Sequence, residues 1–220
     1  YRMHPALASY AAKTFYNGRV ADGVTAEQRQ SCVAWPEMLT GPFYFHAVPG
    51  REYVMGTTRS RANDEEAGAV IDTVQWLSGQ GVNDADIGVI ATYSAQVRVI
   101  SLRLGHRPEI TVSTVDAYQG QEREYIIVSF VRTEGTALQF IASEQRINVA
   151  MTRARRGRVC IGQPDALRHN ALLSGLVQHH AVQGALLEGK VGALTACTVL
   201  HSAGKGEKGE GTAAIAASDT

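Results

Sequence analysis

The 220-residue sequence lacks several features that would each indicate a particular kind of protein. Its three cysteines, Cys32, Cys160 and Cys197, are odd in number and widely spaced, which excludes a disulfide framework and a clustered metal site and favours a reducing compartment. No apolar run reaches membrane-spanning length, and no signal-peptide pattern is present. Because 21 basic residues balance 21 acidic ones, the chain is not a generally basic binder of nucleic acid, although a local basic groove is compatible with that balance.

The sequence also lacks the G-x-x-x-x-G-K-[ST] loop that cradles phosphates in many nucleotide-binding proteins. Its two Gly-Lys pairs, at 189–190 and 204–205, continue as Val191 and Gly206, where the loop needs serine or threonine. If this chain contacts a nucleotide, it must therefore contribute arginines and carboxylates while another domain holds the phosphates.

What the sequence does contain is typical of a globular protein, with 45% hydrophobic and 19% charged residues. Strand-like apolar runs alternate with helical patterns, which predicts an α/β fold with a mostly parallel central sheet flanked by helices. The predicted strands are 43–48, 87–93, 109–117, 124–131 and 157–162. The predicted helices are 5–16, 63–77, 95–104, 144–155, 164–169 and 171–183. Residues 51–63 are expected to form a loop.

The stretch "RINVAMTRARRGR", residues 146–158, holds five arginines and no acid. On the predicted helix, Arg146 and Arg153 share one edge beside an apolar face, and Arg155 points the opposite way. One interpretation is an amphipathic helix with solvated arginines. The other is an anion site, because arginine is always charged and binds phosphate oxygens with two parallel hydrogen bonds.

Three further stretches carry side chains suited to ligands. In "STVDAYQGQERE" (113–124), Glu122 can accept hydrogen bonds from ribose hydroxyls or hold an arginine, or it can be a locally paired surface acid. In "IATYSAQ" (90–96), Tyr93 can stack on a base, although a buried tyrosine is the commoner outcome. In the opening "YRMHP", Arg2 precedes a predicted helix start.

Four stretches occur in a specific order: "YRMHPALASYAAKTFYNGRVADGVTAEQR", "IGVIATYSAQ", "STVDAYQGQEREYIIVSFVRT" and "RINVAMTRARRGRVCIGQPDAL". Together they resemble the second RecA-like domain of superfamily one helicases, most closely the up-frameshift branch that acts in nonsense-mediated mRNA decay. The resemblance covers residues 1–187 and implies a P-loop NTPase-type domain without its own phosphate loop. The Gly-, Ala- and Ser-rich residues 188–220 are expected to be a disordered tail. Since the chain opens without methionine, we interpret it as a fragment.

The family binds ATP and Mg²⁺ between two RecA-like domains, so the resemblance implies that the magnesium ligands lie on a first domain in cis. Arg2 and Arg153 are then the expected catalytic contacts to the γ-phosphate, with Arg153 as an arginine finger. Glu122 is expected to contact the ribose or position Arg153, and Tyr1 to line the nucleotide pocket. The fragment alone is expected to be an inactive half of an ATP-hydrolysing enzyme.

The resemblance further implies contacts to a single nucleic-acid strand, RNA in preference to DNA, with no metal site or membrane segment in this chain and a cytoplasmic location. The residues expected to face the strand are Thr92, Tyr93, Gln96, Thr114, Asp116 and Gln119. Two alternatives are a DNA helicase of the same superfamily and a truncated, non-catalytic module that binds nucleic acid. The family's Cys- and His-rich partner-binding region has no counterpart in these residues.

Overall fold

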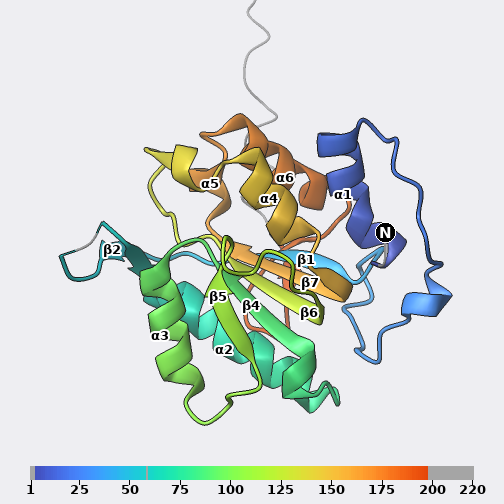
Figure 1. Cartoon of the computed structure of the whole chain (residues 1–220), viewed down its shortest axis with the longest axis horizontal. Helices are drawn as coiled ribbons and strands as arrows, with labels where there is room; N and C mark the ends of the chain where they lie inside the picture. The colour runs from blue at the N-terminus through green and yellow to red at the C-terminus, as the bar shows by residue number, and fades with distance from the viewer. Residues whose placement is uncertain (1–2, 58, 198–220) are drawn as a thin grey trace, which may run out of the picture.

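The computed structural model describes residues 3–57 and 59–197 and contains a seven-stranded sheet with helices on both faces (Figure 1). Five neighbouring pairs of strands are parallel, and only the last pair is antiparallel. In sheet order the strands are β5 (Thr111–Thr114), β4 (Ile87–Ala91), β6 (Arg123–Ser129), β7 (Ala154–Gly162), β1 (Phe43–Ala47), β8 (Leu186–Glu188) and β9 (Thr195–Ala196). The predicted α/β architecture with a mostly parallel sheet is confirmed.

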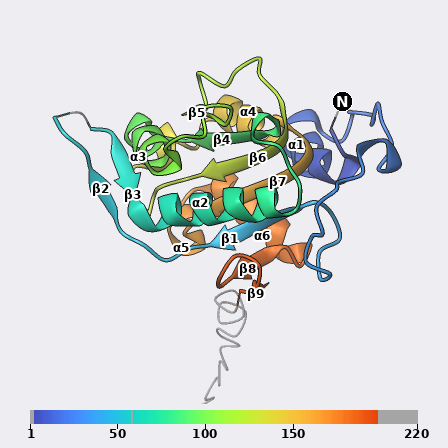
Figure 2. The ribbon, with the colours of Figure 1, turned by 90° about the horizontal axis from the view of Figure 1, so that it is seen from below.

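A pair of helices covers one face of the sheet, and the other α-helices cover the opposite face (Figures 1 and 2). The pair is α2 (Asp64–Gly79) and α3 (Ser94–Leu104), and the other four are α1 (Pro5–Tyr16), α4 (Glu144–Met151), α5 (Pro164–Leu167) and α6 (Ala171–Val182). Both faces of the central strands are therefore buried, which explains why β1 and β4 read as unbroken runs of buried residues. Short 3₁₀ turns occur at Glu27–Arg29 (η1), Asp84–Asp86 (η2) and Leu138–Phe140 (η3).

The start of α2 follows directly from its sequence. The Asn63 side chain accepts a hydrogen bond from the backbone N–H of Glu66 at 3.0 Å, and three acids occupy the first turn. Both features stabilise a helix N-terminus, where backbone N–H groups are unpaired and the helix dipole is positive. This start places the side chain of Glu66 inside the protein, where it is fully buried.

The expected loop at 51–63 is instead an antiparallel hairpin of β2 (Glu52–Val54) and β3 (Arg61–Asn63), which projects beyond one end of the main sheet (Figure 2). Each strand has only three residues, too few for an alternating pattern to emerge from the sequence. Tertiary contacts hold the hairpin instead. Glu52 is buried, and its carboxylate pairs with Arg132 at 2.8 Å.

The predicted helix 144–155 is too long. Helix α4 ends at Met151, and β7 already begins at Ala154, because Ala154 pairs with Arg123 of β6 and extends the parallel ladder. The expectation that Arg146 and Arg153 share one helix edge is therefore wrong. Arg153 lies in the two-residue turn between helix and strand.

The expected boundary at residue 187 is also wrong. Strand β8 runs to Glu188, and β9 pairs with it across a turn, with Leu194 and Cys197 buried beneath. The chain thus contributes to the sheet up to residue 196, and the rest of the expected tail, 198–220, lies outside the described residues. Within the described ranges, no helix is long and apolar enough to cross a membrane.

Gly88 of β4 is required by close packing, because a Cβ there would lie 1.9 Å from the Tyr118 hydroxyl and 2.8 Å from a methyl of Ile126. We expect Gly88→Ala to lower the free energy of unfolding by about 1–3 kcal/mol, the usual cost of overpacking a core. Urea denaturation measures this. In the matched control, Gly175→Ala at an exposed position of α6, the new Cβ meets nothing and the variant should gain up to about 1 kcal/mol. Equal stability of both variants would contradict this packing.

Candidate functional site

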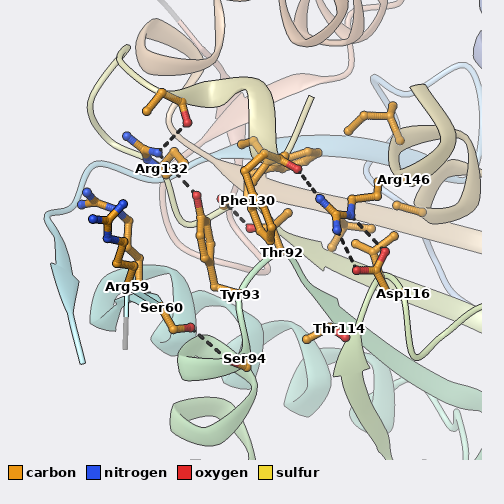
Figure 3. A pocket seen from close by; sticks show the side chains of 18 of the residues that line it. Arg59, Ser60, Thr92, Tyr93, Ser94, Thr114, Asp116, Phe130, Arg132 and Arg146 are labelled. Carbon is orange, nitrogen blue, oxygen red and sulfur yellow. Dashed lines mark hydrogen bonds and ion pairs between the residues drawn. The ribbon is translucent and has the colours of Figure 1, made fainter. Parts of the chain in front are cut away.

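A cleft of about 850 Å³ lies over the carboxyl ends of β4, β5 and β6, between the β2–β3 hairpin and α4 (Figure 3). In parallel α/β sheets, ligands bind at this edge because the chain leaves each strand there in a loop. We call this hollow the large cleft. Its polar and aromatic lining includes Arg59, Ser60, Arg61, Thr92, Tyr93, Ser94, Thr114, Asp116, Arg132, Phe140 and Arg146.

The large cleft carries more cationic than anionic side chains. Arg132 forms a buried ion pair with Glu52 at 2.8 Å, and Arg61 approaches the same carboxylate at 3.6 Å. Arg146 binds both carboxylate oxygens of Asp116, at 2.9 and 2.8 Å. Arg59 has no acidic partner among the residues that the structure describes. The four arginines against two carboxylates leave the cleft with a positive excess.

An aromatic and cationic stack forms one wall of the large cleft. The rings of Tyr93 and Phe140 lie 5.3 Å apart at 30°, and the Arg146 guanidinium lies 4.4 Å from the centre of the Phe140 ring. Arg132 donates to the Tyr93 hydroxyl at 3.4 Å. Tyr93 is therefore buried and fixed, whereas Phe140 is 49% exposed.

Behind this wall, Glu66 holds an unfavourable backbone conformation in place. Val131, the second residue after β6, has a φ of 72°, a region that β-branched residues rarely occupy. Oε2 of the Glu66 carboxyl group accepts hydrogen bonds from the Val131 N–H at 2.9 Å and the Ser129 hydroxyl at 2.7 Å. Burial raises the pKa of Glu66 to about 8. The turn at Val131 directs the next residue, Arg132, into the cleft.

The structure brings together most residues that the sequence predicted to face a strand. Thr92, Tyr93, Thr114 and Asp116 line the large cleft. Gln119 lines a smaller adjoining hollow of about 270 Å³, which it shares with Asp116. The Thr92 hydroxyl itself donates to the Phe130 carbonyl at 2.8 Å and so fixes the junction of β4 and β6.

The prediction that Gln96 faces a bound strand is wrong. Its side chain is completely buried, and its amide joins α3 to the start of α2. Gln96 accepts from the Asn63 N–H at 2.9 Å and donates to the Asn63 carbonyl at 3.0 Å. A glutamine one turn into a helix can face either way, and here the unpaired backbone of Asn63 determines its direction.

Arg153 lines a second hollow of about 380 Å³ together with Met3, Tyr16, Glu122 and Asn148. We call it the Arg153 hollow. The guanidinium donates to the Val149 carbonyl at 3.1 Å and to the Thr152 hydroxyl at 2.9 Å. No carboxylate pairs with it within the described part of the chain. These neutral acceptors orient the arginine without neutralising its charge.

The neighbouring arginines are paired with acids. Arg155 binds Glu122 at 3.0 Å and Glu124 at 3.4 Å, and Arg156 binds Glu124 at 2.7 Å. The expectation that Glu122 positions Arg153 is therefore wrong, because its carboxylate pairs with Arg155. A ribose contact by Glu122, which lines the Arg153 hollow, stays a prediction.

Tyr1 and Arg2 lie outside the described residues, so their expected roles stay predictions. The next residue, Met3, does line the Arg153 hollow. Met3 is buried against it, and the His4 N–H donates to the Arg155 carbonyl at 2.8 Å. The segment before α1 is thus bound to the start of β7.

Sequence reasoning missed Arg59, Arg132 and Phe140. Arg132 carried a usable signal, since it closely follows a buried strand, where ligand-binding residues of parallel sheets gather. Phe140 ends the short 3₁₀ turn η3 and Arg59 lies in the loop of the β2–β3 hairpin, and both segments are too short for periodicity to indicate the direction of a side chain.

Fold and site together define a P-loop NTPase-type α/β domain that lacks its own phosphate loop and presents arginines at the carboxyl edge of its sheet. The chain belongs to the family of AAA domains called AAA_12, whose family model matches residues 1–165. Its sequence matches the C-terminal region of superfamily one helicases and is related to the regulators of nonsense transcripts.

Three relatives illustrate this membership. The chain is 37% identical to the regulator of nonsense transcripts 1 homolog of Arabidopsis thaliana, over 86% of this chain and 16% of the relative. It is 37% identical to the ATP-dependent helicase NAM7 of Saccharomyces cerevisiae, over 90% of this chain and 22% of the relative. It is also 37% identical to the 5'-3' DNA helicase ZGRF1 of Mus musculus, over 81% of this chain and 10% of the relative. The chain thus spans less than a quarter of the length of each of these relatives.

The buried carboxyl of Glu66 predicts a pH dependence of stability. The folded state keeps its proton up to a pKa of about 8, whereas the unfolded carboxyl ionises near its ordinary 4.5. Between these values the unfolded state binds fewer protons, so the free energy of unfolding falls as pH rises, by at most roughly 1.4 kcal/mol per unit. The stabilisation by the protonated Glu66 carboxyl is fully present below pH 4.5, and it is lost by about pH 8, above which stability no longer changes through this group.

Denaturation of the wild type and Glu66→Gln at a series of pH values measures this, because the glutamine does not titrate. The difference in stability should move in favour of Glu66→Gln as pH rises from 5 to 8. Glu65→Gln, an exposed neighbour in the same turn, is the control and should show no such trend. A pH-independent difference for Glu66→Gln would show that its carboxyl is already ionised when buried.

Proposed function

We propose that this chain is the C-terminal motor domain of an ATP-dependent RNA helicase that works in nonsense-mediated mRNA decay in the cytoplasm. In this role it contributes an arginine finger and single-strand contacts to ATP-driven translocation. The observation that carries the proposal is Arg153, a cation held by neutral acceptors in an open hollow beside the start of the chain.

The surroundings of Arg153 suit a phosphate contact. If Arg153 were paired with a carboxylate, that partner would have to be displaced before the guanidinium could reach a phosphate. The acceptors of Arg153 are instead a carbonyl and a hydroxyl. Its charge is therefore available to the phosphate oxygens that gain negative charge as the phosphoryl group leaves. Arg2 would approach the same phosphate, Glu122 the ribose, and Tyr1 the nucleotide pocket.

The remaining parts of the nucleotide site belong to a preceding RecA-like domain in this proposal. That domain would supply the phosphate loop and the ligands of Mg²⁺, which neutralises charge on the β- and γ-phosphates when it is bound. Closure of the two domains would bring Arg153 to the phosphate and exclude water. Reopening after hydrolysis would alternate the grip on the nucleic acid and so move the motor along it.

The large cleft fits a single nucleic-acid strand. Its excess of arginines suits backbone phosphates, and the half-exposed Phe140 offers an aromatic surface on which a base can stack. Neither contact reads a sequence, as a translocating motor requires. Thr92 and Tyr93 are almost fully buried. They therefore support the wall of the cleft and present little polar surface to a strand.

An RNA substrate is favoured by the relatives that are named regulators of nonsense transcripts. The second candidate is a DNA helicase of the same superfamily, which the equal identity to the mouse 5'-3' DNA helicase supports. A strand-binding assay with RNA and DNA of one sequence distinguishes these two candidates.

In a two-domain protein that joins an ATP-binding RecA-like domain to this chain, Arg153→Ala should lower kcat for ATP hydrolysis by about 10³-fold or more. Strand affinity should change little, because Arg153 lies outside the large cleft. Steady-state hydrolysis and fluorescence anisotropy measure the two properties. The control is Arg156→Ala, whose side chain pairs with Glu124 and does not line the hollow. Near-normal turnover by Arg153→Ala would rule out the arginine finger.

Phe140→Ala should weaken binding of a labelled single strand by about 1–3 kcal/mol, the usual contribution of one stacked base. Anisotropy titrations at fixed salt, with RNA and with DNA, measure the change. Leu102→Ala is the matched control, since Leu102 is an equally apolar, 74% exposed side chain of α3 that does not line the cleft. If both variants bind as the wild type does, the strand does not stack on Phe140.

A further inference from the structure

Arg158 is a buried cation whose contacts are all to neutral groups. Its side chain on β7 is 1% exposed, and no carboxylate pairs with it among residues 3–57 and 59–197. Its Nη1 donates to the Met151 carbonyl at 2.8 Å and to the Leu7 carbonyl at 3.3 Å. Its Nε and Nη2 have no hydrogen-bond partner there.

The position is costly for an arginine. The strand continues with the buried Val159, Cys160 and Ile161, so an apolar residue would suit the same space. Burying an ionised group without a counter-ion is unfavourable, and burial accordingly lowers the pKa of Arg158. Neighbouring His180 does not add a second charge, because burial and then Arg158 lower its pKa to about 3.

The two carbonyls that Arg158 binds belong to elements on either side of the Arg153 hollow. Met151 is the last residue of α4, where the helix dipole is negative and carbonyls lack helical partners, and Arg153 follows two residues later. Leu7 lies in the first turn of α1, directly after the segment that holds Met3 in the hollow. One side chain therefore joins the end of α4 to the start of α1.

Other bonds between these elements lie at the surface. The Asn148 amide of α4 donates to the Tyr16 hydroxyl at 2.8 Å, but Tyr16 is 38% exposed and at the far end of α1. Strand β7 supports both helices from the side of the sheet. Within the described residues, Arg158 of this strand is the only side chain that binds both α1 and α4 from that side.

We propose that Arg158 is a positioning residue of the nucleotide site, which fixes the last turn of α4, and with it Arg153, relative to α1. The proposal rests on the proposed role of Arg153 as the finger. It predicts that loss of Arg158 lowers catalysis by displacing Arg153, while nucleotide and strand affinity are retained.

The test uses the two-domain protein and compares Arg158→Met, Arg158→Lys and Arg153→Ala. Arg158→Met keeps the length of the side chain but removes its donors, and should lower kcat roughly ten- to a hundredfold, as a misplaced catalytic group does. The KM for ATP and the strand Kd should stay within about twofold of the wild type, as expected when only transition-state contacts are lost. Arg158→Lys can still reach one carbonyl and should recover part of the kcat. The control is Arg156→Met, on the same strand but paired at the surface with Glu124.

A second measurement covers the case in which Arg158→Met does not fold. Amide hydrogen exchange at Thr152 and Arg153 should be faster in Arg158→Lys than in the wild type, with β4 unchanged as the internal reference. Unchanged exchange there, or a kcat of Arg158→Met within twofold of the wild type, would overturn the inference. Normal turnover by Arg153→Ala would instead overturn the proposed function on which it rests.

Discussion

The parallel pairing of β6 with β7 determines where the central arginines of this domain lie. The ladder begins at Ala154, and the Arg123 N–H binds the Arg153 carbonyl at 3.1 Å just before it. Helix α4 must therefore end by Met151, and the backbone of Arg153 is fixed in the turn between them. A helix continued to residue 155 would give up these sheet hydrogen bonds. It would also direct Arg153 along the helix surface instead of into the hollow.

The same sheet fixes the large cleft, because strands that run in parallel deliver their loops to one edge. There β6 ends in the strained turn at Val131, which persists because Glu66 accepts its N–H from inside the protein. Such a conformation costs about 1–3 kcal/mol and needs surroundings that hold it. Its result is the inward direction of Arg132, which joins the hairpin through Glu52 and the aromatic wall through Tyr93. Buried groups that a ligand would not contact therefore shape the surface that the ligand would contact.

The sequence predicted strands β1, β4, β5, β6 and β7 and all main helices, because apolar runs and capping residues are local signals, but it did not predict the short β8 and β9. It predicted less where partners come from distant segments. The hairpin at 52–63 depends on Arg132, 80 residues from Glu52, and the direction of Gln96 depends on Asn63. The end of α4 was misjudged because Ala154 fits a helix as well as a strand, and only its pairing with β6 decides between them.

The distribution of acids explains how a chain of zero net charge can present two cationic hollows. Around the arginine-rich segment, Asp116, Glu122 and Glu124 pair with Arg146, Arg155 and Arg156. These pairs are partly exposed, so they contribute little stability, but they lower the local excess of charge. Arg153 is left with neutral acceptors and lines a hollow. Arg158 is left with two carbonyls and lies buried beneath that hollow. Selective pairing, and not the number of arginines, therefore concentrates positive charge at the point where a phosphate could reach it.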